Sequence, residues 1–278
     1  MKFIKMEGLG NDYVYVDLFT EPPPDGDLAY LARRVSDRHF GVGSDGLVLV
    51  MPSQQADCRM RMFNSDGSES EMCGNAVRCI TKLMYDAGRH RDGAVTIETL
   101  DGVKTGTVIE HRGNAALVEV SMGTPRFAAH DIPTLLGSGE AVGVLLPIDG
   151  TPYTVTCVSM GNPHCVIVTD EITDGLVAGL GPRIERHEAF PARTNVEFAR
   201  VVDPHTIEMR VWERGAGETL ACGTGACATL AACVRLGLCE RAVSMRLRGG
   251  TMDLRWDEGG SVIVRAPAVT VFTGEICI

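Results

Sequence analysis

The sequence is poor in lysine and has no block of positive charge. Its 278 residues carry a net charge of −10. A surface of this kind does not attract phosphate backbones or anionic lipid headgroups, so neither nucleic acid nor a membrane is an expected partner. The four lysines are Lys2, Lys5, Lys82 and Lys104. None lies in a setting typical of a lysine that binds pyridoxal phosphate, so no cofactor of this kind is expected.

The sequence also lacks a long hydrophobic run. Its longest uncharged, mostly apolar stretch is Thr219–Val234, which falls short of the ~20 residues a membrane helix needs. Its content of Gly, Ala, Thr and Cys indicates a buried helix instead. Charges in Met1–Glu7 interrupt any apolar signal region, so we expect a cytoplasmic protein.

Cysteine is abundant, but the spacings that would bind a metal are absent. None of the ten cysteines forms a Cys-x-x-Cys pair, and no His/Cys group has zinc-finger spacing. We therefore expect no metal site. Without an export signal, reduced thiols are expected rather than a disulfide framework. The hydrophobic fraction of 45% and the charged fraction of 22% are ordinary for a globular protein.

A pattern centred on Cys-Gly occurs twice in the chain. Cys73 lies nine residues after Asn64, and Cys222 lies nine residues after Glu213. In both places an alternating, strand-like run comes before the polar residue, and a helix-like segment follows the cysteine. A Gly-Asn pair also precedes each cysteine, with its Asn 62 residues earlier in the first half and 60 earlier in the second. Such agreement predicts two related halves.

The surrounding patterns predict the same order of elements in each half. In the first half we expect strands 13–16, 47–51, 59–62, 95–99, 103–109 and 116–122. One helix is expected from Asp27, and a second follows Cys73 and ends near Gly88. In the second half we expect strands 165–168, 196–198, 206–212, 243–247, 252–256 and 261–264, with one helix from Pro182 and another that follows Cys222 and ends near Gly237. The fold class is α+β, with two pseudo-symmetric domains, each a curved, mostly antiparallel sheet around a central helix. The expected domains are 1–122, joined by a C-terminal strand 268–278, and 123–267.

A cysteine at a helix N-terminus lies beside unpaired backbone N–H groups and the positive end of the helix dipole. Both effects favour thiolate and predict a pKa for Cys73 and Cys222 below the usual ~8.5. The same N–H groups suit a carboxylate. Two such thiols predict an enzyme that inverts a stereocentre, one thiolate removing an α-proton while the other thiol protonates the opposite face.

Each cysteine needs a group that sets its protonation state, and His164 and Glu213 are the best candidates. Both belong to the duplicated motifs. Taken alone, His164 would be read as a core histidine and Glu213 as a solvated strand end. Their positions in the repeat favour the catalytic interpretation.

Five motifs together resemble the diaminopimelate epimerase family, over almost the whole chain. They are Gly8-Leu-Gly-Asn-Asp12, Asn64-x-Asp-Gly-Ser68, Cys73-Gly-Asn-Ala-x-Arg-Cys79, Met160-Gly-Asn-Pro-His164 and Glu213-Arg-Gly-Ala-Gly-Glu-Thr-x-Ala-Cys-Gly-Thr-Gly225. The resemblance implies a homodimeric, pyridoxal-independent epimerase that interconverts LL- and meso-2,6-diaminopimelate for lysine and peptidoglycan synthesis. It also implies two domains that meet at a cleft.

Carried over by position, the resemblance implies that Cys73 and Cys222 are the acid–base pair. Backbone N–H groups would hold the reacting carboxylate, and side chains would bind the rest of the substrate. The N–H donors are those of Gly74, Asn75, Gly223 and Thr224; the side chains are those of Asn11, Asn64, Asn162, Asn195, Glu213 and Arg214. An arginine can bind a distal carboxylate through two hydrogen bonds. Turn formation is the alternative role for the asparagines.

Three alternatives remain open. A proline or hydroxyproline racemase would use the same cysteine pair without the Asn/Glu/Arg set. A metal-binding or redox protein would contain stoichiometric metal. A binding module could retain this fold without catalysis. Oxidation could also join Cys73 and Cys222 in a disulfide, which predicts loss of activity in air and recovery with a thiol reductant.

Overall fold

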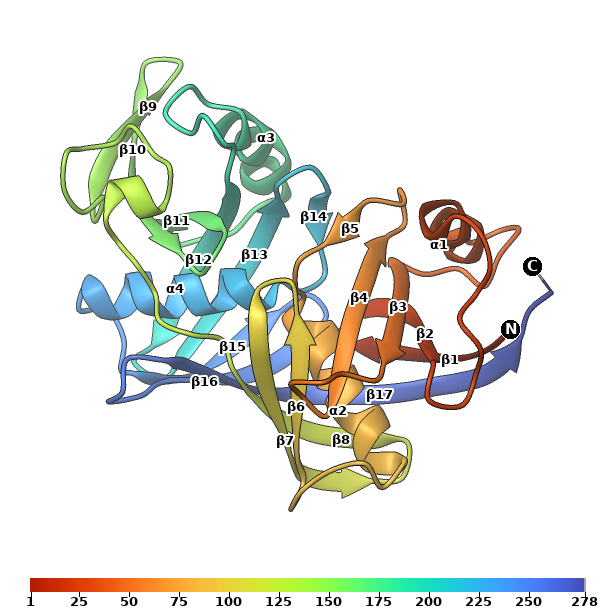
Figure 1. Cartoon of the computed structure of the whole chain (residues 1–278). Coiled ribbons are helices and arrows are strands. Elements are labelled where there is room, and N and C mark those ends of the chain that lie inside the picture. Colours follow the sequence, from red (N-terminus) through yellow and green to blue (C-terminus); the bar gives the residue numbers. More distant parts are fainter. Residues whose placement is uncertain (278) are drawn as a thin grey trace. The chain divides into compact units, whose positions relative to one another are not determined.

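The computed structural model describes residues 1–277 as 17 strands, four α-helices and one short 3-10 helix, an α+β fold (Figure 1). The chain divides into two compact units. Unit 1 is formed by residues 1–121 with the segment from 265 onward, and unit 2 by residues 122–264. None of the described helices has the length and apolar character required to span a lipid bilayer.

Unit 1 contains two helices and most of its strands in one continuous stretch of chain. Its elements are β1 (Lys2–Gly8), β2 (Asn11–Asp17), α1 (Leu28–Ser36), β3 (Gly46–Met51), β4 (Cys58–Asn64), β5 (Glu69–Ser70), α2 (Gly74–Asp86), β6 (Ala94–Thr99), β7 (Gly102–Arg112) and β8 (Ala115–Ser121). Helix α2 contacts β1, β6, β7 and β8, and its residues from Gly74 to Met84 are all buried. It is the central helix predicted for this half.

Unit 2 repeats this arrangement. Its elements are η1 (Ala129–Asp131), β9 (Val144–Ile148), β10 (Thr151–Ser159), β11 (Pro163–Val168), α3 (Asp174–Glu185), β12 (Asn195–Asp203), β13 (Thr206–Glu213), β14 (Gly217–Thr219), α4 (Gly223–Arg235), β15 (Ala242–Leu247) and β16 (Gly250–Trp256). Helix α4 contacts β10 to β13 and β16, and its residues from Gly225 to Cys233 are buried. The last strand, β17 (Val262–Glu275), begins in unit 2 and continues in unit 1.

The strand pairings show that the two halves are equivalent. In unit 1, β2 pairs in parallel with β3, β3 is antiparallel to β4, and β4 pairs with β5 and β6. In unit 2, β11 pairs in parallel with β12, β12 is antiparallel to β13, and β13 pairs with β14 and β15. Each ladder has the same direction as its counterpart, so the duplication predicted from the cysteine motifs is present in the backbone.

Both Cys-headed helices end as predicted. Gly88 and Gly237 adopt positive φ values of 68° and 71° immediately after the C-caps of α2 and α4. The following N–H groups, of Arg89 and Leu238, donate back to Met84 O and Cys233 O. This arrangement satisfies carbonyls that the end of a helix would leave unpaired.

Helix α3 corrects the prediction of a helix from Pro182. The helix begins at Asp174, and Pro182 lies inside it. Thr173 caps it, since its hydroxyl accepts a hydrogen bond from Leu176 N–H at 3.1 Å. Gly175, Gly179 and Gly181 have low helix propensity, which hides the helix in the sequence.

Candidate active site

The two cysteines occupy the N-cap positions of α2 and α4. Both have extended backbones, with φ/ψ of −141°/120° at Cys73 and −124°/113° at Cys222. The first backbone hydrogen bonds of these helices run from Val77 to Cys73 O and from Ala226 to Cys222 O. The four amides proposed to hold a carboxylate lie ahead of these bonds, at the positive end of each helix; they belong to Gly74, Asn75, Gly223 and Thr224.

The hydrogen bonds of Cys73 are arranged by Asn11 and Asn75. Asn11 Nδ2 donates to Asp45 Oδ2 at 2.9 Å, which turns Asn11 Oδ1 towards Cys73 Sγ, 3.6 Å away. Asn75 Nδ2 donates to Asn11 Oδ1 as well, at 3.0 Å, and Asn75 Oδ1 accepts from Arg78 Nη2 at 2.7 Å. Asn11 therefore presents an acceptor to Cys73, which suits a protonated thiol.

A charged cluster behind Asn11 keeps its amide in this orientation. Arg38 Nη2 lies 3.0 Å from both Asp12 Oδ1 and Asp45 Oδ1, and Lys5 contacts Asp12 from the buried side. Burial raises the pKa of Asp45, with the nearby Asp12 carboxylate contributing. For Asp12 burial acts in the same direction, but hydrogen bonds from Lys5 and Arg38 outweigh it and lower the pKa.

Cys222 has a different environment, in which donors face the sulfur. Gly225 N–H donates to Cys222 Sγ at 3.4 Å, and the Thr224 hydroxyl lies 3.5 Å from it. Asn162 Nδ2 donates to Thr224 Oγ1 at 3.3 Å. The two cysteines are therefore equivalent in the fold but not in their hydrogen bonding.

The pKa of Cys222 corrects a prediction. The sequence predicts a lowered pKa, but the residue is only 7% exposed and the pKa of its thiol is raised well above the usual value. Burial is the main cause, followed by the charges of Glu213 and Glu197. The hydrogen bonds from Thr224 and Gly225 act in the opposite direction without offsetting these effects.

His164 is fully buried on β11 and is held through both ring nitrogens. Nδ1 lies 2.7 Å from Glu197 Oε1, and Nε2 lies 2.9 Å from Asn162 Oδ1. His164 therefore reaches Cys222 through Asn162 and Thr224. Glu213 stands at the end of β13, where its carboxylate accepts a hydrogen bond from the Thr219 hydroxyl.

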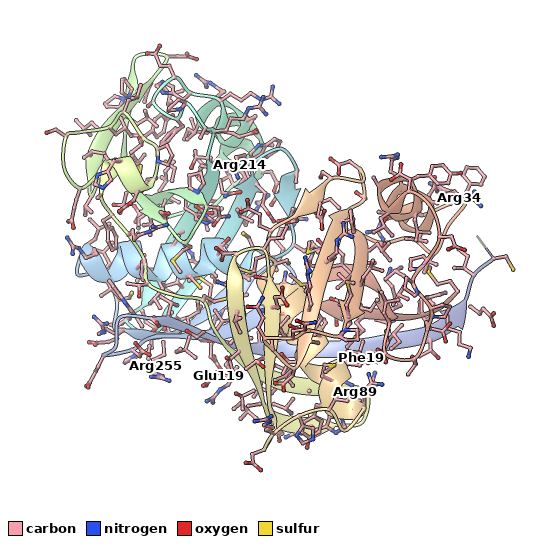
Figure 2. All side chains as sticks on the ribbon, viewed as in Figure 1. Phe19, Arg34, Arg89, Glu119, Arg214 and Arg255 are labelled. Carbon is pink, nitrogen blue, oxygen red and sulfur yellow. The ribbon has the colours of Figure 1, made fainter. Side chains whose placement is uncertain are left out.

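The remaining predicted side chains are hydrogen-bonded to other residues of the protein. Asn195 is 4% exposed and joins segments distant in the sequence: its Nδ2 donates to Pro163 O and its Oδ1 accepts from Arg214 N–H, both at 2.9 Å. Asn64 Nδ2 donates to Ser68 Oγ at 3.0 Å within a turn. The exposed Arg214, labelled in Figure 2, donates to Ala192 O at 3.1 Å. Contact of these three side chains with a substrate stays a prediction.

The ladders match the polar positions of the two halves. Gly46 pairs with Tyr13 and Asn64, just as Asn195 pairs with His164 and, one step beyond the Val196–Trp212 pair in the same register, corresponds to Glu213. A Cβ at Gly46 would lie 2.0 Å from Phe63 O, so unit 1 has no space for the counterpart of Asn195. Glu213 is thus the counterpart of Asn64.

Sequence reasoning missed Arg78, Asp45 and Glu197 as parts of these networks. Arg78 and Glu197 are both 0% exposed. The signal for Glu197 is a charge inside the apolar run Val196–Phe198, and the signal for Arg78 is a charge on the buried face of its helix. Among residues 1–277, no three His, Cys, Asp or Glu side chains gather closely enough to bind a metal ion.

Comparison with solved structures defines the fold class. A probable proline racemase from Agrobacterium radiobacter superposes with a TM-score of 0.71 at 15% identity, over 100% of this chain and 93% of that one. A methylitaconate-delta-isomerase gives 0.68 at 14% identity, over 99% and 95%. A Bacillus anthracis protein of the PhzF family gives 0.66 at 16% identity, over 100% and 99%. The fold is therefore the duplicated α+β fold of these proteins.

Sequence comparison then identifies the family. The sequence model of diaminopimelate epimerase matches residues 3–128 and 156–275. Proteins named diaminopimelate epimerase are 51% identical in Desulfovibrio desulfuricans, over 100% of this chain and 99% of that protein, and 50% identical in Acetivibrio thermocellus, over 99% and 98%. One from Methanococcus maripaludis is 48% identical over the full length of both. The chain belongs to the diaminopimelate epimerase family, whose members are isomerases.

Proposed function

We propose that this protein is a diaminopimelate epimerase that interconverts the LL and meso isomers of 2,6-diaminopimelate without a cofactor. The observation that carries the proposal is the pair of helix-capping thiols, each beside backbone N–H groups and each at the same place in one half of a duplicated fold. Membership of the diaminopimelate epimerase family is the basis for the choice of substrate. The reaction belongs to lysine and peptidoglycan precursor synthesis.

In the proposed reaction a thiolate removes the α-proton and a thiol donates a proton to the opposite face. Cys222 Sγ⁻ takes the proton from Cα, whose electron pair is delocalised into the carboxylate held by helix N–H groups. Cys73 Sγ–H then protonates the carbon, which leaves Cys73 as thiolate and Cys222 as thiol. In the reverse direction the two cysteines exchange roles.

The different hydrogen bonding of the two cysteines supports this assignment of roles. Asn11 Oδ1 is an acceptor placed for the thiol of Cys73, whereas Gly225 N–H is a donor placed for the sulfur of Cys222. The raised pKa of Cys222 makes its thiolate a stronger base once formed. A bound α-ammonium group would favour that thiolate electrostatically.

Incubation of the reduced protein with LL-diaminopimelate in D2O tests the proposal. We expect the meso isomer to form with one solvent deuteron at the inverted carbon, as measured by chiral separation and mass spectrometry. Cys73→Ala and Cys222→Ala should each abolish epimerisation. Absence of both epimerisation and exchange in the reduced wild-type protein would refute the assignment.

Replacement of Arg214 separates this function from racemisation of proline, which has no distal carboxylate. We propose that Arg214 binds that carboxylate, so Arg214→Met should lower kcat/KM about a hundredfold, mostly through KM. Arg186→Met, which changes another exposed arginine of unit 2, is the control. Unaltered kcat/KM in Arg214→Met would argue against a distal carboxylate contact.

We further propose that the enzyme is a cytoplasmic homodimer, as the family resemblance implies. All ten cysteines are free thiols, which suits a reducing compartment. Light scattering coupled to size-exclusion chromatography measures the oligomeric state, and a monomer at the concentrations that support turnover would contradict this part.

A further inference from the structure

Glu197 is a buried carboxylate that the proposed chemistry does not use directly. It lies on β12 and is 0% exposed. Oε1 is held by His164 Nδ1 at 2.7 Å, whereas Oε2 is the one buried side-chain oxygen or nitrogen among the described residues without a hydrogen-bond partner. A half-satisfied buried carboxylate destabilises a fold, so its presence requires another reason.

The first half shows that the fold does not require an acid at this position. In unit 1 the parallel ladder pairs Tyr15 with Val48, and in unit 2 the matching ladder pairs Val166 with Glu197. Val48 is 0% exposed, so an apolar residue fills the same place without an unsatisfied group. The carboxylate is therefore specific to the half that contains Cys222.

A continuous set of hydrogen bonds joins Glu197 to Cys222. It runs from Glu197 to His164 Nδ1 (2.7 Å), from His164 Nε2 to Asn162 Oδ1 (2.9 Å), and from Asn162 Nδ2 to Thr224 Oγ1 (3.3 Å). The last contact, of 3.5 Å, joins Thr224 Oγ1 to Cys222 Sγ. All five residues belong to unit 2.

The hydrogen bonds of this set all donate in the same direction, from His164 towards Cys222. Asn162 donates from Nδ2 to Thr224, so its Oδ1 accepts from His164 Nε2–H, and the Thr224 hydroxyl keeps its own proton for donation to Cys222 Sγ. His164 Nδ1 faces a carboxylate, which accepts when ionised. Two acceptors beside the ring match a histidine with a proton on each nitrogen, whose charge the Glu197 carboxylate would balance.

Gly225 allows Glu197 to approach the head of α4. A Cβ at this glycine would lie 2.7 Å from Glu197 Oε1 and 3.3 Å from Cys222 Sγ. The carboxylate and the sulfur therefore border the same methyl-sized space. Besides His164, the titratable groups affected by the charge of Glu197 are Cys165 on β11 and Cys222, and Glu213 also acts on Cys222.

We propose that Glu197 is a positioning residue that keeps His164 doubly protonated and so directs the hydrogen bonds of Asn162 and Thr224 towards the sulfur of Cys222. The proposal rests on the proposed function only in giving Cys222 an acid–base role. In Glu197→Gln the balancing charge is gone, and the amide oxygen, at the place of Oε1, would keep the one remaining ring proton on Nδ1 and leave His164 Nε2 as an acceptor. Asn162 would then turn its amide to donate to Nε2, and Thr224 would donate to Asn162 Oδ1 instead of to Cys222.

Nitrogen-15 NMR of the histidine rings tests the protonation state without reference to activity. The His164 signals, assigned by their loss in His164→Gln, should show two protonated nitrogens in the wild type at neutral pH. Glu197→Gln should convert them to the pattern of a neutral ring. Glu208→Gln, which removes a carboxylate paired with Arg200 on the adjacent strand, should leave them unchanged. A neutral His164 ring in the wild type would overturn the proposal, even if the protein epimerises nothing.

Kinetics of a double-mutant cycle test the path through Thr224. Glu197→Gln and Thr224→Val should each lower kcat about tenfold with little change in KM, and the double variant should lose no more than either single one. Thr224→Ser keeps the hydroxyl and should retain most of kcat. Additive losses would show that Glu197 acts by another route, and a loss confined to KM would also overturn the proposal. If the wild type is inactive, the proposed function fails, and the NMR result still decides the role of Glu197.

Discussion

Around Cys222, three influences raise the pKa of the thiol: burial first, then Glu213 and Glu197. Because an anion disfavours a neighbouring thiolate, removing the charge of Glu213 should lower this pKa. In Glu213→Gln we expect the rate of Cys222 alkylation by iodoacetamide to reach half its maximum at a lower pH than in the wild type. Peptide mass spectrometry with Cys73 replaced by Ala would isolate the Cys222 signal.

Glu208→Gln is the matched control, since Glu208 lies on the same strand and pairs with Arg200 and Arg246. Its alkylation profile should coincide with that of the wild type. A midpoint that stays in place or rises in Glu213→Gln would mean that the Glu213 charge does not act on the sulfur.

Some residues of the site could be predicted from the sequence, and others could not. Cys73 and Cys222 could be found because a helix N-cap, a following glycine and a fixed spacing are local features. The link from His164 to Glu197 could not, because it joins two strands 33 residues apart and depends on their register. The sequence predicts the wrong direction for the shift of the Cys222 pKa, because burial of the thiol is a property of the packed structure and not of the local sequence.

Among the elements, helix α3 shows how packing can override propensity. Gly181 lies against the Trp212 ring, where a Cβ would come within 2.7 Å of the Trp212 Cβ. Trp212 Nε1 also donates to Glu185 Oε2 at 3.0 Å near the end of the helix. A sequence rich in glycine therefore forms a helix that is fixed by a tryptophan.

Gly181→Ala and Gly179→Ala should shift stability in opposite directions. Gly181→Ala should reduce the free energy of unfolding by about 1–3 kcal/mol, since the added methyl overlaps the Trp212 side chain. Gly179 has no atom within 4 Å of such a Cβ, so Gly179→Ala should stabilise the protein by about 0.5–1 kcal/mol through helix propensity. Urea titration measures both, and equal effects of the two changes would contradict this account of α3.

Strand β17 shows why the C-terminal elements were only partly predicted. The sequence predicts strand 261–264 and a separate strand 268–278, of which residue 278 lies outside the described residues. The structure has one strand, Val262–Glu275, through Pro267. The Pro267 carbonyl accepts a hydrogen bond from Arg78 Nε at 3.4 Å.

At the scale of the whole molecule, unit 1 depends on its C-terminal segment. The β1–β17 ladder pairs Met6 with Thr270, and Thr270 N–H donates to Asn114 O at 2.7 Å. Thr270→Pro should remove this donor to the turn between β7 and β8, with a loss of about 2–3 kcal/mol in the free energy of unfolding. Hydrogen exchange should show reduced amide protection in β8 and β17 beside this turn and unchanged protection in β11 and β12.

Thr270→Ala keeps the N–H and is the control for the loss of the side chain alone. Its β8 and β17 amides should exchange as in the wild type. Reduced protection spread evenly over both units in Thr270→Pro would mean that they unfold as one cooperative block.

The shared strand also bears on how the protein is made. The N-terminal strand β1 pairs from Lys2 to Glu7 with residues of β17 that the ribosome adds after the whole of unit 2. Unit 2 lies wholly between these segments in the chain, so all of it has been synthesised before unit 1 can close. The half that begins first is completed second. Its β1 edge therefore stays open during translation, when an unpaired strand is most exposed to wrong partners.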